Sequence, residues 1–282
     1  MKCTLCPVSC CAERETKSGY CGVNGIRIAK YYLHPFEEPP ISFKKGSGCV
    51  FFCGCSLKCV FCQNYELSRN TRGKNITVKE LADIFKQLED MGAENIDLVT
   101  GDHLSPYIIE ALALYRPKVP VIYNSSGYCK IEALKEIDPY IDIYLPDLKF
   151  VSPELSKRYT GREDYFEYAS KAIEFMAKKP ASQENGQMKS GIIVRHLILP
   201  CCSFDSLKVL DFLKSVLPED ATLSLMRQYT PMGEIEGYPE LQRTLTNREY
   251  NRVKDYALSL GFNLYTQGKN SADKAFIPDW QE

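Results

Sequence analysis

Residues 50–62 read Val50-Phe51-Phe52-Cys53-Gly54-Cys55-Ser56-Leu57-Lys58-Cys59-Val60-Phe61-Cys62. The apolar run at the start predicts a buried β-strand, and the loop after it carries three cysteines at the spacing C-x3-C-x2-C. Thiolates suit iron–sulfur clusters, and so compact a loop brings three of them to three irons of one cubane. We therefore predict that Cys55, Cys59 and Cys62 hold a [4Fe–4S] cluster; a zinc knuckle and scattered buried thiols are the alternatives.

The fourth iron of such a cluster has no cysteine within this loop. S-adenosylmethionine (SAM) can chelate an open iron through its amino and carboxylate groups, and one electron from the cluster then breaks its S–C5′ bond. The loop chemistry therefore favours reductive cleavage of SAM as a working hypothesis.

After the cysteine loop, short apolar runs alternate with amphipathic stretches. Strands are expected at 50–52, 96–99, 119–123, 141–145, 191–199, 223–226 and 263–266, and helices at 105–114, 131–137, 165–176 and 207–216. Two capping boxes, Thr77–Glu80 and Thr246–Glu249, begin further helices. This alternation predicts βα units around a parallel sheet, and about six units favour an open or partial α/β barrel over a closed one. The polar residues 180–190 are expected to form a solvated loop.

The composition argues against several classes of protein. The 282 residues carry a net charge of −1, which does not indicate binding of nucleic acid. We find no apolar run of about 18 residues and no leader at Met1, so we expect a cytoplasmic protein without a membrane span. The 13 cysteines are an odd number, which favours metal or redox chemistry over a disulfide framework.

Residues 1–45 are rich in cysteine and too short to bury a core alone, so we treat them as a segment distinct from the barrel at 46–282. Its cysteines form a C-x2-C pair followed by Cys10 or Cys11 and then one more thiol. We predict a second metal, either zinc or an auxiliary iron–sulfur cluster, on Cys3, Cys6, Cys10 and Cys21. Ordinary buried or redox-active thiols are the alternative.

Longer motifs lie in order along nearly the whole chain. They read Glu38-Pro39-Pro40-Ile41-Ser42, Gly46-Ser47-Gly48, Cys62-Gln63-Asn64-Tyr65-Glu66, Tyr123-Asn124-Ser125-Ser126-Gly127-Tyr128, Asp142-Ile143-Tyr144-Leu145-Pro146-Asp147-Leu148-Lys149, Arg195-His196-Leu197-Ile198-Leu199-Pro200 and Gln228-Tyr229-Thr230-Pro231. On these motifs the sequence resembles the radical SAM superfamily, and more closely the pyruvate formate-lyase activating branch of the glycyl-radical activating enzymes. The resemblance implies a partial (β/α)6 barrel of the radical SAM type. It also implies SAM and [4Fe–4S] cofactors, and a flavodoxin or ferredoxin as electron donor in an anaerobic cytoplasm.

The resemblance further implies roles for residues that follow the predicted strands. The loop Gly101-Asp102-His103, where this branch is expected to have Pro-Thr-His, implies contact with the SAM amine. The residues implied around the SAM ribose, its carboxylate or a monovalent cation are Asn124, Ser125, Ser126, Asp147 and Lys149. Arg195 interrupts an apolar strand, so we expect it to meet a carboxylate. Tyr229, beside Gln228, is expected near the adenine or ribose.

Purely structural interpretations compete with these roles. His103 is equally explained as a neighbour of a helix N-terminus, the Asp147–Lys149 pair as a surface ion pair, and Tyr229 as part of the core. Alternation places Arg195 and His196 on opposite faces of their strand, so only one of them points into the barrel. We favour His196 as a hydrogen-bonded core histidine.

Three functions remain open from the sequence. The first is activation of a glycyl-radical enzyme, in which the 5′-deoxyadenosyl radical abstracts hydrogen from a glycine of a partner protein. The second is radical modification of another peptide, a nucleotide or a small molecule, which the departures at Gly101-Asp102 and Cys201-Cys202 keep open. The third is a zinc-stabilised scaffold without catalysis, which the polar residues at strand ends disfavour.

Overall fold

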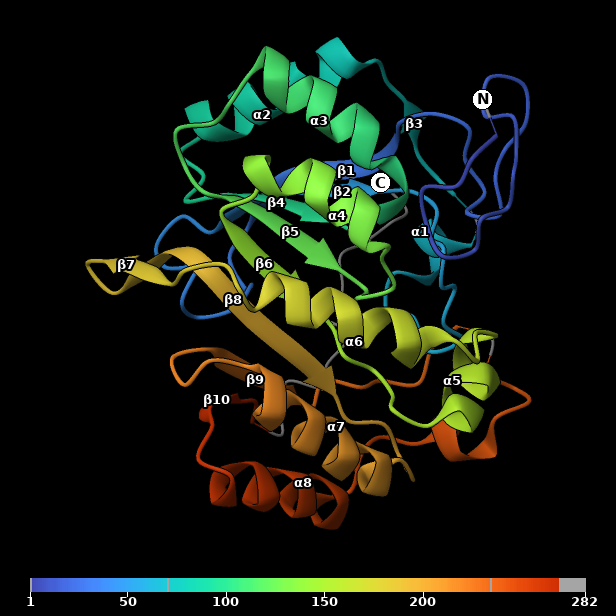
Figure 1. Cartoon of the computed structure of the whole chain (residues 1–282), viewed down its shortest axis with the longest axis vertical. Helices are drawn as coiled ribbons and strands as arrows, with labels where there is room; N and C mark the ends of the chain where they lie inside the picture. Colours follow the sequence, from blue (N-terminus) through green and yellow to red (C-terminus); the bar gives the residue numbers. More distant parts are fainter. Residues whose placement is uncertain (1, 70, 234, 269–282) are drawn as a thin grey trace.

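A computed structural model describes residues 2–69, 71–233 and 235–268 and centres on one curved, open sheet (Figure 1). The parallel strands are β2 (Ser47–Phe52), β4 (Ile96–Val99), β5 (Val121–Ser125), β6 (Ile143–Pro146), β8 (Gln187–Leu197), β9 (Thr222–Met226) and β10 (Asn263–Thr266). The antiparallel strands are β1 (Arg27–His34), β3 (Lys74–Asn75) and β7 (Ser182–Glu184). The order is β10-β9-β8-β6-β5-β4-β2-β1-β3, with β7 paired to β8. The two end strands do not pair with each other, so the barrel is unclosed and the predicted partial α/β barrel is confirmed.

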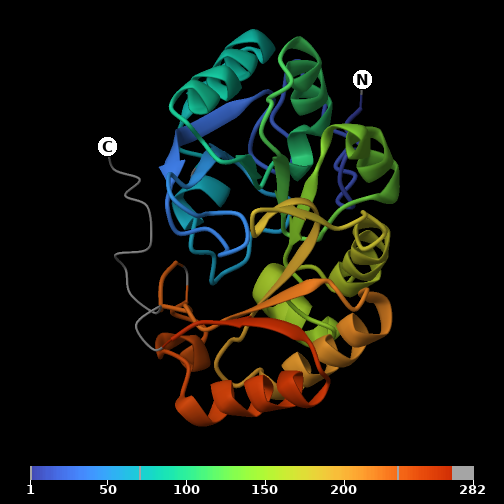
Figure 2. The ribbon, with the colours of Figure 1, turned by 90° about the vertical axis from the view of Figure 1, so that its left-hand side faces the viewer.

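Helices pack on the outside of the curved sheet (Figures 1 and 2). The long ones are α2 (Val78–Asp90), α3 (Ser105–Leu114), α6 (Tyr165–Met176), α7 (Ser203–Val216) and α8 (Asn247–Ser259). Shorter ones are α1 (Tyr65–Ser68), α4 (Ile131–Ile137), α5 (Pro153–Thr160) and the 3-10 turns η1 (Asp102–Leu104), η2 (Asp138–Tyr140) and η3 (Pro239–Gln242). In α2 the buried residues include Leu81, Phe85 and Leu88, whose helical spacing forms one apolar stripe.

Both predicted capping boxes are confirmed. Thr77 Oγ1 accepts a hydrogen bond from the Glu80 backbone N–H at 3.1 Å, and the Glu80 carboxylate accepts one from the Thr77 N–H at 2.7 Å. Thr246 and Glu249 repeat the arrangement at 3.2 and 3.0 Å. These bonds satisfy backbone N–H groups that have no partner within the helix, so α2 and α8 begin where the sequence predicts.

The predicted loop at 180–190 is wrong, because β7 and the start of β8 form a β-hairpin there. Asn185 and Gly186 sit at the turn with φ of 52° and 81°. An Asn-Gly pair adopts positive φ readily, and such pairs make tight hairpin turns even between polar strands. The polar composition therefore reflects an exposed hairpin. Strands β1 and β3 and helices α1 and α5 are also absent from the sequence-based prediction.

The cysteine-rich N-terminal segment packs onto the barrel. Cys21, Val23 and Ile26 belong to the main hydrophobic core. The Cys21 carbonyl accepts a hydrogen bond from the Cys55 N–H at 3.2 Å, and Lys130 Nζ donates to the Thr4 carbonyl at 2.9 Å. The segment thus directly supports the three-cysteine loop. Within the described residues, no helix is both long and apolar enough to span a membrane.

Candidate active site

A cavity of about 570 Å³ opens at the carboxyl ends of the parallel strands. Residues from β2, β4, β5, β8, β9 and β10 line it, together with the loops that follow several of these strands. Cys55, Cys59 and Cys62 all lie on its wall. The fold therefore brings the three-cysteine loop to the place where the sequence predicts polar residues from other strands.

The cysteine loop is shaped by its neighbours. Gly54 has a φ of +84°, and a Cβ there would lie 2.6 Å from the Cys21 carbonyl oxygen. The Leu57 N–H donates to Cys55 Sγ at 3.3 Å. The Phe61 ring packs edge-on against other aromatic rings of the core. Backbone N–H donors and a tight turn are suited to presenting several sulfur ligands to one cluster.

Burial raises the pKa of the Cys55 thiol to about 11, and it also raises the pKa of Cys59 and Cys62. Buried thiolates need nearby positive charge, which iron provides when it replaces the thiol protons. Lys149 also provides positive charge. It lowers the pKa of Cys59, although the opposite effect of burial is larger. The donor set and its surroundings therefore fit an iron–sulfur cluster.

Asp147 anchors an ion-pair cluster among the residues that line the same cavity. Its carboxylate accepts from Lys149 Nζ at 2.7 Å and from Arg195 Nε at 2.9 Å, and Arg195 Nη2 also donates to Asn124 Oδ1 at 2.6 Å. The three charged side chains are only 14–16% exposed. Burial would raise the pKa of Asp147, but Arg195 and Lys149 hold it below its ordinary value. The interpretation as a surface ion pair is therefore wrong.

His196 points away from this cluster, as the alternation predicts. Its Nδ1 lies 2.6 Å from the Leu148 carbonyl and its Nε2 lies 2.9 Å from Ser206 Oγ. Burial lowers the pKa of this ring. The prediction of a hydrogen-bonded core histidine is confirmed, and Arg195 is the residue that lines the cavity.

Gly101, Asp102 and His103 lie outside the set of residues that line the cavity. Asp102 accepts from Cys129 Sγ at 3.2 Å, and His103 Nε2 lies 2.9 Å from the Cys53 carbonyl. The residue of this loop that does line the cavity is Thr100, with a φ of 60°. Contact between SAM and the three predicted residues thus stays a prediction, because none of the three lines the cavity. Thr100 was missed because a positive φ leaves no signal in the sequence.

The remaining predicted residues Asn124, Ser125, Ser126 and Tyr229 line the cavity. The Tyr229 ring is buried and its hydroxyl donates to the Leu241 carbonyl at 2.5 Å, so this side chain also belongs to the core. Sequence reasoning assigned no role to two carboxylates that line the same cavity, Glu37 and Glu38. The adjacent pair ahead of Pro39-Pro40 was the available signal.

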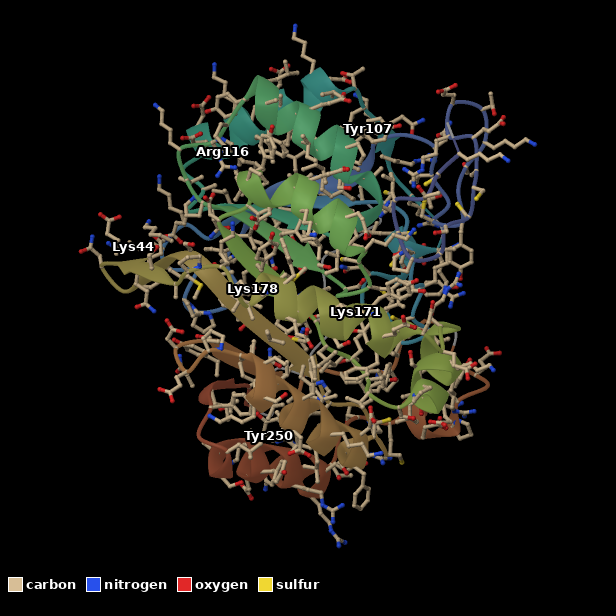
Figure 3. The ribbon with its side chains drawn as sticks, in the orientation of Figure 1. Lys44, Tyr107, Arg116, Lys171, Lys178 and Tyr250 are labelled. Carbon is tan, nitrogen blue, oxygen red and sulfur yellow. The ribbon has the colours of Figure 1, made fainter. Side chains whose placement is uncertain are left out.

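The N-terminal cysteines form a second group of thiols. Cys3, Cys6 and Cys21 are buried, Cys10 is half-buried and Cys11 is exposed. A Cβ on Gly19 would lie 3.3 Å from Cys10 Sγ and 3.4 Å from Cys21 Sγ, so both sulfurs lie close to this glycine. Figure 3 shows sulfur atoms gathered where the N-terminal segment packs on the barrel. Cys10 is less exposed than Cys11, and the metal set Cys3, Cys6, Cys10 and Cys21 stays a prediction.

Comparisons with known proteins agree with this geometry. The profile of the radical SAM superfamily matches residues 49–183. An uncharacterized protein of Methanocaldococcus jannaschii is 30% identical over 276 residues, which are 93% of this chain and 76% of that protein. The pyruvate formate-lyase-activating enzyme of Clostridium pasteurianum is 27% identical over 158 residues, which are 54% of this chain and 61% of that enzyme.

Among solved structures, SuiB from Streptococcus suis is similar with a TM-score of 0.52 at 17% identity. The match covers 78% of this chain and 48% of the SuiB chain, so this chain spans about half of that protein. At this identity the likeness concerns the fold.

Proposed function

We propose that this chain, which belongs to the radical SAM superfamily and is similar to a pyruvate formate-lyase-activating enzyme, activates a glycyl-radical enzyme. Enzymes of this superfamily use a [4Fe–4S] cluster and SAM, which supply a 5′-deoxyadenosyl radical on one-electron reduction. The observation that carries the proposal is the placement of Cys55, Cys59 and Cys62 on the wall of a cavity that also holds the Asp147 ion-pair cluster.

The residues of this chain have distinct tasks in the proposal. Cys55, Cys59 and Cys62 hold the cluster. Asn124, Lys149 and Arg195 present polar groups to the zwitterionic and ribose parts of SAM. Asp147 fixes both cations, since it accepts from each of them. The rings of Phe51, Phe52 and Phe61 line the cavity and keep water out of part of it, which strengthens the electrostatic contacts inside.

The glycine substrate rests on the relationship to the Clostridium pasteurianum enzyme. Hydrogen abstraction from a partner requires that a loop of the partner reach the cavity. We assign the electron supply to a flavodoxin or ferredoxin and the location to an anaerobic cytoplasm. We also assign a zinc ion or an auxiliary [4Fe–4S] cluster to Cys3, Cys6, Cys10 and Cys21, within a segment at residues 1–45 that supports the barrel at 46–282.

The first test is anaerobic reconstitution, followed by iron and sulfide analysis and an assay for 5′-deoxyadenosine. Wild type is compared with a triple variant in which Cys55, Cys59 and Cys62 are each replaced by Ala. A Cys53→Ala variant is the matched control, because Cys53 is a buried thiol that donates to the Arg72 carbonyl instead. We expect 5′-deoxyadenosine from wild type and control and only background from the triple variant.

The second test addresses the substrate. The reconstituted protein is incubated with SAM, reductant and glycyl-radical enzymes from its own genome, and the glycyl radical is measured by electron paramagnetic resonance. A glycyl signal that needs all three components supports activation. Active cleavage of SAM without a glycyl signal from any of these partners would refute activation and leave a radical SAM enzyme with another substrate.

A further inference from the structure

Three potential metal ligands meet in the barrel interior beside the cavity. One ligand atom each from Glu37, Cys49 and Asp97 lies within 4.8 Å of the other two. Cys49 on β2 and Asp97 on β4 are paired across neighbouring parallel strands, so their side chains share the interior face. We propose that these residues bind one divalent transition-metal ion, Zn²⁺ or Fe²⁺, at a site separate from the three-cysteine loop.

An unpaired oxygen points to a ligand at this site. Asp97 is fully buried, and its Oδ1 accepts no hydrogen bond from an N–H or O–H donor among the described residues; the neighbouring Glu37 carboxyl pairs with Asp97 only when one of the two carries a proton. Its other oxygen, Oδ2, accepts from Asn124 Nδ2 at 3.0 Å and from Cys49 Sγ at 3.5 Å. A buried carboxylate oxygen without a partner is unfavourable, and a bound cation would satisfy it.

The charges around the site also favour a cation. The acidic side chains Glu37, Glu38, Asp97 and Asp147 interact with one another here, against the cations Arg195 and Lys149. Arg195 lies 3.7 Å from Glu37, but its closer ion pair is with Asp147. The group therefore has two more carboxylates than cations, and the thiolate of Cys49 adds a third negative charge when it binds an ion, so one divalent ion would balance most of this excess.

The ligand types select the kind of ion. A thiolate with two carboxylates suits Zn²⁺ or Fe²⁺, whereas Mg²⁺ and Ca²⁺ prefer oxygen alone. Asn124 holds Asp97 in place through its hydrogen bond, which is the role of a residue that orients a metal ligand. Glu37 lines the cavity, so an ion has a path to the site from there.

The test counts metal that is not part of a cluster. In the reconstituted enzyme, cluster iron is matched by an equal amount of acid-labile sulfide. Total metal minus sulfide therefore counts mononuclear ions after incubation with Zn²⁺ or Fe²⁺ and removal of the excess. We expect Cys49→Ala and Asp97→Asn each to lower this difference by about one ion per chain, with sulfide unchanged.

Two controls separate this site from the others. Cys53→Ala removes a nearby buried thiol outside the group and should keep the ion. Cys6→Ala should remove only metal bound by the N-terminal cysteines and should leave the ion at Glu37, Cys49 and Asp97 in place. In a second measurement, wild type and Cys49→Ala are each stripped with a chelator and titrated with Co²⁺, whose electron paramagnetic resonance reports binding.

Binding of Co²⁺ by wild type, lost in Cys49→Ala, supports the site. Two results would overturn the proposal. In the first, wild type loaded with Zn²⁺ or Fe²⁺ contains no more metal than sulfide once the N-terminal ion is subtracted. In the second, the excess of metal over sulfide stays the same in Cys49→Ala and in Asp97→Asn. Glu37 and Asp97 would then share a proton in place of a metal.

Discussion

Replacing Arg195 with Met tests the ion-pair cluster quantitatively. The Arg195 side chain is only 15% exposed and contacts Asp147 at 2.9 Å, Asn124 at 2.6 Å and Glu37 at 3.7 Å. Removing one partner of a buried ion pair costs about 3–5 kcal/mol, because the remaining charge is left unpaired. Lys149 still pairs with Asp147 at 2.7 Å, so we expect a loss at the lower end, about 3 kcal/mol.

The assay is urea unfolding of the anaerobic holoenzyme at neutral pH, followed by circular dichroism. In a thermal unfolding experiment on the same samples, the expected loss corresponds to a fall in Tm of about 6–12 °C for a chain of this size. Arg116→Met is the matched control, because Arg116 lies on the outer surface (Figure 3) and its ion pair with Asp142, at 2.7 Å, is 40% and 32% exposed. We expect the control to lose less than about 1 kcal/mol.

The direction in which the stabilisation by this ion pair changes with pH follows from the pKa of Asp147. Because Arg195 and Lys149 hold its pKa below the ordinary value of 3.8, the stabilisation is fully present above that value. It is lost as the pH falls through the lowered pKa, so the difference between wild type and Arg195→Met should shrink in acid. Equal losses for Arg195→Met and Arg116→Met at neutral pH would refute the reasoning.

Three further changes should each affect one feature. Gly54→Ala places a Cβ 2.6 Å from the Cys21 carbonyl at positive φ, so we expect a loss of more than about 1 kcal/mol and less cluster iron. Thr77→Ala removes the cap of α2 and should cost about 1 kcal/mol in urea unfolding. Burial lowers the pKa of His103 to about 4, so stability should fall as the pH drops from about 6.5 to 4, by on the order of 3 kcal/mol. His103→Gln should remove that part of the pH dependence.

These expectations have specific controls. Gly261 also has positive φ, but a Cβ there would meet nothing within 4 Å, so Gly261→Ala should leave the cluster iron unchanged. Equal iron loss in both glycine variants would argue against the contact with Cys21. A stability profile of His103→Gln that follows wild type between pH 4 and 6.5 would show that this ring does not cause the pH dependence.

The fold was predictable because its elements have strong local signals. Apolar runs and capping boxes located the helices and parallel strands, as the boxes at Thr77 and Thr246 illustrate. The hairpin at 182–190 was missed because polar composition was given more weight than the Asn185-Gly186 turn. Strand β1 was missed because its residues show no apolar run, since only Ile28 among them is buried.

The sequence alone determined the chemistry that local spacing encodes. A thiol triplet in eight residues can reach one cluster whatever surrounds it, so the spacing alone is enough to propose Cys55, Cys59 and Cys62 as cluster ligands. Tertiary structure decided which distant groups meet. The Asp147–Arg195 pair spans 48 residues, and the group of Glu37, Cys49 and Asp97 joins three separate segments. Such contacts depend on strand register and side-chain direction, which are set by the packing of the whole sheet.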